Sequence, residues 1–198
     1  IKIKKMLSYK ESLKILKETN ALIEGHFILS SGLHSPQYVQ CAQLMSKPDK
    51  AKKLCESLSK KIKNEFKEFD IILSPAMGGI VIGYEIGRLL NIETIFSERV
   101  NGVFELRRDF SIKKDQKVLI VEDVITTGKS SLECSKLVLD KKANIVGYAC
   151  LIDRSKGKSL LKEKIVSQVE IDIPTYTKNN LPNNLSALKA VKPGSRNI

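Results

Sequence analysis

The chain has 198 residues, of which 42% are hydrophobic and 28% charged, and its formal net charge is +12. A chain of this length buries one substantial core, so we expect a single domain over 1–198. No apolar run approaches the ~20 residues that a membrane-spanning helix requires, and the N-terminus lacks the pattern of a secretory signal, which favours a cytoplasmic protein with no membrane partner.

The positive charge is mostly lysine, spread over expected helix faces among acidic residues and with few aromatic residues. This distribution favours a solvated surface over a nucleic-acid interface. The arginines are placed differently, because Arg99, Arg107, Arg108 and Arg154 fall in loop or motif segments. Arginine presents a planar, permanently charged fork that suits phosphate and carboxylate groups, so these positions are candidates for anion contacts. Ordinary surface pairing is the alternative.

In chain order, the first half begins with two amphipathic helices, expected over 8–21 and 48–66. A short apolar run at 70–74 predicts a strand, and the glycine pair 78–79 predicts a tight turn after it. A helical pattern then continues over 80–89. The order is strand, glycine loop, helix.

The second half repeats this order. Further strands are expected over 93–96, 117–121, 144–152 and 169–173, with a helix over 129–139 and a polar tail at the end. Between the first two of these strands, the segment 97–110 contains Asn101-Gly102, a strong hairpin-turn dipeptide. We expect a mobile hairpin or lid there.

Strands that alternate with helices predict an α/β fold, with a parallel sheet covered on both faces and right-handed crossovers. Ligands of such sheets bind beyond the C-terminal ends of the strands. The loops 74–79, 122–130 and 153–157 each follow an expected strand, so we expect the site among them.

The segment VLIVEDVITTGKS, 118–130, carries the chemistry. Its strand brings Glu122 and Asp123 to the sheet edge, and the loop after them offers hydroxyls and amides at a helix N-terminus, which favours anions. A ligand with phosphate at one end and vicinal hydroxyls at the other, such as a ribose 5-phosphate, would match both halves.

The same residues are compatible with two other interpretations. Residues 128–130 resemble the end of a Walker A loop, but that pattern requires a glycine five residues before Gly128, where Asp123 stands. Simple helix capping by the acids and threonines is commonplace, although two acids, two threonines and a glycine together favour a ligand site. Metal binding is not indicated, because the four cysteines form no CxxC pair and His26 and His34 lack a third ligand.

The segment resembles the signature of type I phosphoribosyltransferases, in which two acids bind ribose hydroxyls and the TTG-type loop binds the 5-phosphate of phosphoribosyl pyrophosphate (PRPP). Further segments extend the resemblance to the orotate phosphoribosyltransferase family. They are GHFILSSGLHSPQY at 25–38, SPAMGG at 74–79, FSERVNG at 96–102, CLIDRS at 150–155 and KPGSR at 192–196.

The resemblance implies transfer of the phosphoribosyl group from PRPP to orotate, giving orotidine 5'-phosphate and pyrophosphate in pyrimidine biosynthesis. It also implies a core over about 46–175 under a small hood built from about 1–45 and the tail 176–198. Mg²⁺ would be held mainly through PRPP and not by protein ligands. A homodimer is implied, because the family's lid commonly serves the neighbouring subunit's site.

Residue roles follow from the same resemblance. Catalytic roles are implied for Glu122, Asp123 and Arg99, the last in the lid. The PRPP site would comprise Glu122, Asp123, Val124, Ile125, Thr126, Thr127, Gly128, Lys129, Ser130 and Arg99. Orotate contacts are implied for Thr126 and Arg154. A cation at a strand end could indeed clamp a carboxylate, although an ion pair with Asp153 is the alternative.

The chain departs from well-known family members in two places. They carry a lysine where this chain has Gly78, and a lysine and a histidine in the lid where this chain reads ERVNGVFELRR. Arg99, Arg107 or Arg108 could supply the lid's charge instead. The alternatives that stay open are a purine phosphoribosyltransferase and a PRPP-sensing regulator that binds nucleic acid.

Overall fold

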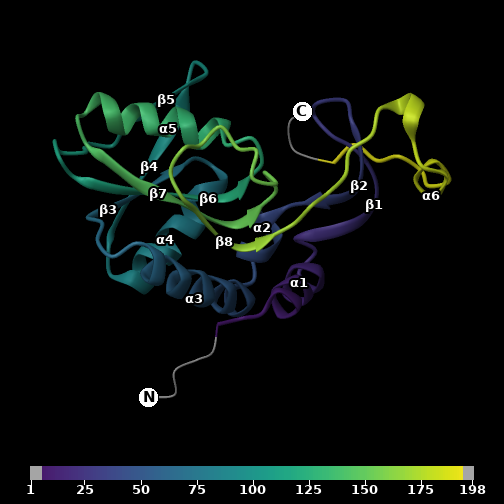
Figure 1. Ribbon diagram of the computed structural model, residues 1–198, viewed down its shortest axis with the longest axis horizontal. Helices are drawn as coiled ribbons and strands as arrows, with labels where there is room; N and C mark the ends of the chain where they lie inside the picture. The colour runs from purple at the N-terminus through teal and green to yellow at the C-terminus, as the bar shows by residue number, and fades with distance from the viewer. Residues whose placement is uncertain (1–5, 194–198) are drawn as a thin grey trace.

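The computed structural model describes residues 6–193. A six-stranded sheet forms the centre, helices cover both of its faces, and a two-stranded sheet stands to one side (Figure 1). The predicted α/β fold with a helix-flanked sheet is confirmed. Within residues 6–193, no helix combines the length and the apolar character that crossing a bilayer requires.

The elements follow the expected order. The helices are α1 (Tyr9–Glu18), α2 (Cys41–Met45), α3 (Pro48–Glu65), α4 (Gly78–Leu90), α5 (Lys129–Asp140) and α6 (Asn183–Ser186), with a 3-10 turn, η1 (Lys178–Asn180). The strands are β1 (Leu22–Ile28), β2 (His34–Val39), β3 (Ile71–Pro75), β4 (Glu93–Val100), β5 (Val103–Leu106), β6 (Lys117–Ile125), β7 (Asn144–Asp153) and β8 (Ile165–Glu170). The large sheet has the order β5-β4-β3-β6-β7-β8, and β6 lies near its middle.

The expected hairpin is confirmed, but it makes the sheet mixed. β4 and β5 pair antiparallel, and every other pair of neighbouring strands in this sheet is parallel. Asn101 and Gly102 both have positive φ, 48° and 86°, as the two central residues of the commonest two-residue hairpin turn require. The expectation of a wholly parallel sheet was therefore wrong at this edge.

The last strand lies earlier in the chain than predicted. β8 spans Ile165–Glu170, whereas the sequence pattern favoured 169–173. Ile171 and Ile173 are buried, but they pack into the core as extended chain beyond the end of the strand. Their alternation with polar residues therefore resembled a strand that is not in the sheet.

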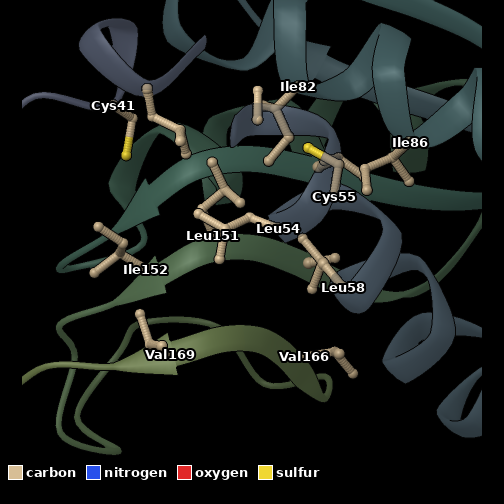
Figure 2. Packing of buried hydrophobic residues seen from close by; sticks show 14 of the residues in the cluster. Cys41, Leu54, Cys55, Leu58, Ile82, Ile86, Leu151, Ile152, Val166 and Val169 are labelled. Atoms are coloured by element: carbon tan, nitrogen blue, oxygen red, sulfur yellow. The ribbon is translucent and has the colours of Figure 1, made fainter. Parts of the chain in front are cut away.

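The core divides into two layers because β3, β6 and β7 are buried on both faces. Alternate residues of β6 point to opposite sides: Leu119 and Val121 face the layer under α3 and α4, and Val118 and Ile120 face α5. Figure 2 shows the first layer, where leucines of α3 and isoleucines of α4 meet β7 and β8. The same alternation determines that the next two residues of β6, Glu122 and Asp123, point to opposite faces of the sheet.

The hood joins the two ends of the described chain. β1 and β2 pair antiparallel, and the C-terminal segment forms single bridges to both of them, at Phe27–Val191 and His34–Tyr176. His26 and His34 face each other inside, with Nε2 and Nδ1 2.6 Å apart, and Nδ1 of His26 donates to the carbonyl of Leu188 at 3.0 Å. The sequence pattern predicted neither β1 nor β2.

Candidate functional site

The two acids of β6 point to opposite faces of the sheet, as strand alternation requires. Glu122 faces α5, where the hydroxyl of Ser131 donates to its Oε2. Asp123 faces the start of α4, so that a Cβ added at Gly78 would lie 2.8 Å from both of its carboxylate oxygens. Gly78 therefore has no room for the family's lysine while Asp123 holds this position.

Both carboxylates sit in a partly dehydrated environment. Burial raises the pKa of Glu122 to about 7; the hydrogen bond from Ser131 opposes this rise, and the charge of Asp123 adds to it. Burial also raises the pKa of Asp123, against the N–H of Val124, which donates to its Oδ1 at 2.9 Å. Carboxylates placed this way lie at the sheet edge and can accept hydrogens from vicinal hydroxyls.

The loop after β6 prepares an anion site at the start of α5. Gly128 caps this helix with φ of 79° and offers no side-chain acceptor to the first turn. The N–H of Lys129 donates to the hydroxyl of Thr127 at 3.3 Å. The amides that follow in the first turn have no acceptor within the helix and can donate to a phosphate. A Cβ at Gly128 would lie 2.7 Å from Cγ of Leu161, and the N–H of Leu160 donates to the carbonyl of Thr127 at 2.9 Å. The segment after β7 thus packs against the loop.

Arg154 and Thr126 come together where β6 and β7 end. The N–H of Arg154 donates to the carbonyl of Ile125 at 2.7 Å, which places Arg154 directly beside Thr126. Its Nε is buried and, within the part of the chain that the structure describes, has no hydrogen-bond partner; burial lowers its pKa. Among the described residues, Arg154 forms no ion pair with Asp153, whose Oδ1 accepts the N–H of Ser155 at 2.7 Å. The guanidinium is therefore available to a ligand.

Arg99 lies elsewhere, on the hairpin and against α5. It pairs with Glu133 in the same chain, donates to the carbonyl of Gly102 and stacks 4.1 Å from the centre of the Phe104 ring. Arg108 pairs with Glu98 at 2.9 Å. Arg99 and Arg108 are thus engaged within the same chain and do not pair with the carboxylates of β6 in this conformation.

Sequence reasoning missed Ser131, a fully buried polar residue that holds Glu122. A signal for it exists, because the buried face of α5 consists of Ser131, Cys134, Ser135 and Val138, and serines are unusual at such positions. Among residues 6–193, no group of three or more histidine, cysteine or acidic side chains could hold a metal ion by itself.

Comparisons with known proteins agree with this geometry. The model of the phosphoribosyl transferase domain matches residues 43–182. An orotate phosphoribosyltransferase of Parvibaculum lavamentivorans is 47% identical over 189 residues, which cover 93% of this chain and 97% of the relative.

Solved structures share the fold. The orotate phosphoribosyltransferase from Aeropyrum pernix matches with a TM-score of 0.70 at 22% identity, over 80% of this chain and 92% of that one. The adenine phosphoribosyltransferase from Thermoanaerobacter pseudethanolicus matches with a TM-score of 0.60 at 17% identity, over 68% and 88%. Both kinds of enzyme share this fold, so the fold alone does not distinguish orotate from a purine as the base. The 47% sequence identity to a relative matched over 97% of its length does assign a family. The chain belongs to the orotate phosphoribosyltransferase family of the phosphoribosyltransferases.

Proposed function

We propose that the protein transfers the 5-phosphoribosyl group from PRPP to orotate, yielding orotidine 5'-phosphate and pyrophosphate. The observation that carries the choice of orotate is Arg154, whose buried Nε lacks a partner beside the ribose-phosphate loop. Orotate is a planar carboxylate, and a guanidinium binds such a group in bidentate fashion. A neutral purine would leave this buried cation unpaired.

In the reaction, N1 of orotate bonds to C1 of the ribose as the bond from C1 to the pyrophosphate oxygen breaks. Positive charge develops on the ribose in an oxocarbenium-like transition state. Glu122 and Asp123 hold the ribose hydroxyls from opposite sides of β6, while the loop from Val124 to Ser130 anchors the 5-phosphate. Fixing both ends of the sugar aligns C1 with the attacking nitrogen, which Thr126 and Arg154 position.

Mg²⁺ fits this site as an ion carried by the substrate. The carboxylates are hard oxygen donors at the sheet edge, but each is already occupied on one side, Glu122 by Ser131 and Asp123 by the N–H of Val124. When bound through pyrophosphate and ribose oxygens, the ion would neutralise charge on the leaving group.

The hairpin over 97–110 is the proposed lid, since water would otherwise hydrolyse the activated sugar. Arg99 is its proposed catalytic cation. Reaching pyrophosphate would require Arg99 to leave Glu133 and the carbonyl of Gly102.

A second copy of the chain is the proposed partner, in the cytoplasm. α4 exposes an apolar stripe beginning just before its first residue, with Met77 83%, Val81 52% and Tyr84 66% exposed. The spacing of these residues puts them on one side of the helix, and an exposed apolar stripe of this kind marks an interaction surface.

The activity is tested by supplying Mg²⁺ and PRPP with orotate, uracil, adenine or hypoxanthine in turn. We expect pyrophosphate release with orotate and orotidine 5'-phosphate as the product. Conversion of a purine, with orotate left unchanged, would overturn the proposal.

The role of Arg154 is tested separately by Arg154→Ala. Loss of a charge-assisted bidentate contact should raise KM for orotate about 100-fold or more, whereas the affinity for PRPP, measured by calorimetry without orotate, should stay within about threefold of wild type. Arg154→Lys keeps the charge but loses the fork and should fall between the two. An equal loss of both ligands in Arg154→Ala would count against an orotate contact.

A further inference from the structure

The buried face of α5 is polar at its N-terminal end, next to the proposed ribose site. Ser131 is fully buried and Ser135, one turn later, is 3% exposed. Alanine would fill either position without the need for a hydrogen-bond partner. Each serine instead has a defined contact, and the two contacts lead to different places.

Ser135 belongs to the interior. Its hydroxyl donates to the backbone carbonyl of Ser131 at 2.8 Å and lies 2.7 Å from the hydroxyl of Tyr148 on β7. The Tyr148 hydroxyl in turn donates to Glu163 at 3.1 Å. This chain of contacts runs away from the sheet edge and touches neither acid of β6. It ties α5 to β7 and to the segment before β8.

Ser131 belongs to the site. Its hydroxyl donates to Oε2 of Glu122, and no other side chain in the described part of the chain donates to that carboxylate. Oε1 is therefore left to accept a hydrogen from the ligand. Ser131 lies in the first turn of α5, whose N-terminus is the proposed 5-phosphate site. The same helix therefore also holds Glu122, the proposed acceptor for a ribose hydroxyl.

We infer that Ser131 is a positioning residue for PRPP: its hydroxyl orients Glu122 and favours the ionised carboxylate, so that the free oxygen of Glu122 accepts a ribose hydroxyl. The inference rests on the proposed role of Glu122 in binding ribose. It goes beyond that role, because it assigns the support of the carboxylate to a side chain outside the signature loop.

The titratable groups around Glu122 determine how the pH dependence of kcat/KM should respond to a change at Ser131. Asp123 follows it on β6, and the thiols of Cys134 on α5 and Cys150 on β7 face it, both with pKa values raised by burial and both therefore neutral. Burial, and after it the charge of Asp123, disfavours the ionised form of Glu122, whereas the hydrogen bond from Ser131 favours it. Removing this hydroxyl should move the pKa of Glu122 further upward.

The experiment measures kcat/KM for PRPP in Ser131→Ala between about pH 5.5 and 9. Removing a hydrogen bond to a charged group should lower kcat/KM about tenfold near neutral pH. The acidic limb should move to higher pH, so that the loss shrinks at the alkaline end. Ser131→Thr, which keeps the hydroxyl, should restore the wild-type limb.

Ser135→Ala is the matched control, since it removes a buried hydroxyl from the same face of α5 without touching Glu122. It should lower the melting temperature as much as Ser131→Ala does and leave the acidic limb of the kcat/KM profile in place.

In a Glu122→Gln background, Ser131→Ala should have little further effect on kcat/KM. If Glu122→Gln lowers kcat/KM but Ser131→Ala leaves the limb unmoved, the inference fails alone. If Glu122→Gln changes nothing, the proposed role of Glu122 fails and the inference falls with it.

Discussion

At the scale of single residues, the site depends on two adjacent acids that the strand separates. Consecutive residues of β6 face opposite sides, so Glu122 is supported from α5 and Asp123 sits at the start of α4. Glu122 keeps one oxygen, Oε1, that no described donor occupies. The two neighbouring acids can therefore both bind one sugar although each is held by a different hydrogen-bond donor.

The pKa of Glu122, raised by burial to about 7 from the ordinary 4.5, predicts a pH dependence. Only the ionised form is purely an acceptor, so kcat/KM for PRPP should rise with pH through an ionisation near 7. Glu122→Gln should lower kcat/KM and abolish this ionisation. PRPP titrates equally with both proteins, so the difference between the two profiles isolates the side chain. Identical profiles would contradict the assignment.

The contribution of Glu122 to the free energy of unfolding should change in the opposite direction and fall as pH rises. Because the folded-state pKa is the higher one, the folded protein holds the proton more tightly than the unfolded chain, and this contribution to stability is full below about pH 4.5. It is lost as pH rises through about 7. We therefore expect activity to rise over the same pH interval in which this contribution to stability is lost.

Much of the site could be predicted from residue order, because strand ends of a parallel sheet meet at one edge. This predicted that the loops 122–130 and 153–157 lie at the same edge, and in the structure the N–H of Arg154 donates to the carbonyl of Ile125. Contacts that depend on tertiary packing could not be predicted in this way. The fit of Gly78 against Asp123, and the pairing of His26 with His34, each require knowing how distant segments approach.

At the scale of elements, the long helices, the buried strands and the hairpin were predictable, whereas the strands β1 and β2 were not. The runs that became β3 and β6 are apolar on both faces, a pattern that few other structures share. β1 and β2 alternate poorly, pair with each other through a shifted register, and form single bridges to the C-terminal segment. Their strand character is therefore set by pairing and not by local pattern.

The hairpin of β4 and β5 provides a prediction at this scale. Its tip is held to α5 through Arg99, which pairs with Glu133 and stacks on Phe104. Glu133→Ala should speed amide hydrogen exchange in β5 several-fold, because an exposed ion pair contributes about 0–1 kcal/mol. Exchange in β6 should not change. Glu105→Ala, on the same hairpin, is the control, and a hairpin equally protected in Glu133→Ala would show that the pair does not hold it.

At the scale of the whole molecule, charge and exposed apolar surface play different roles. The net charge of +12 favours the approach of a substrate as anionic as PRPP, an effect that salt should weaken. The apolar stripe of α4 cannot serve that purpose. It lies on the helix whose first residues border Asp123, so a copy docked there would stand close to the site.

Val81→Glu tests the proposed dimer. In a two-fold symmetric interface the substitution buries a carboxylate on both sides at once, so its cost counts twice and dissociation should be complete at micromolar concentrations. Sedimentation velocity should show a dimer for the wild-type protein and a monomer for Val81→Glu. Leu139→Glu is the matched control, since Leu139 is 59% exposed on α5, across the sheet from α4. If the lid of one copy serves the site of the other, the Val81→Glu monomer should also lose turnover while still binding PRPP. A Val81→Glu dimer, or a wild-type monomer, would refute the assignment of this face.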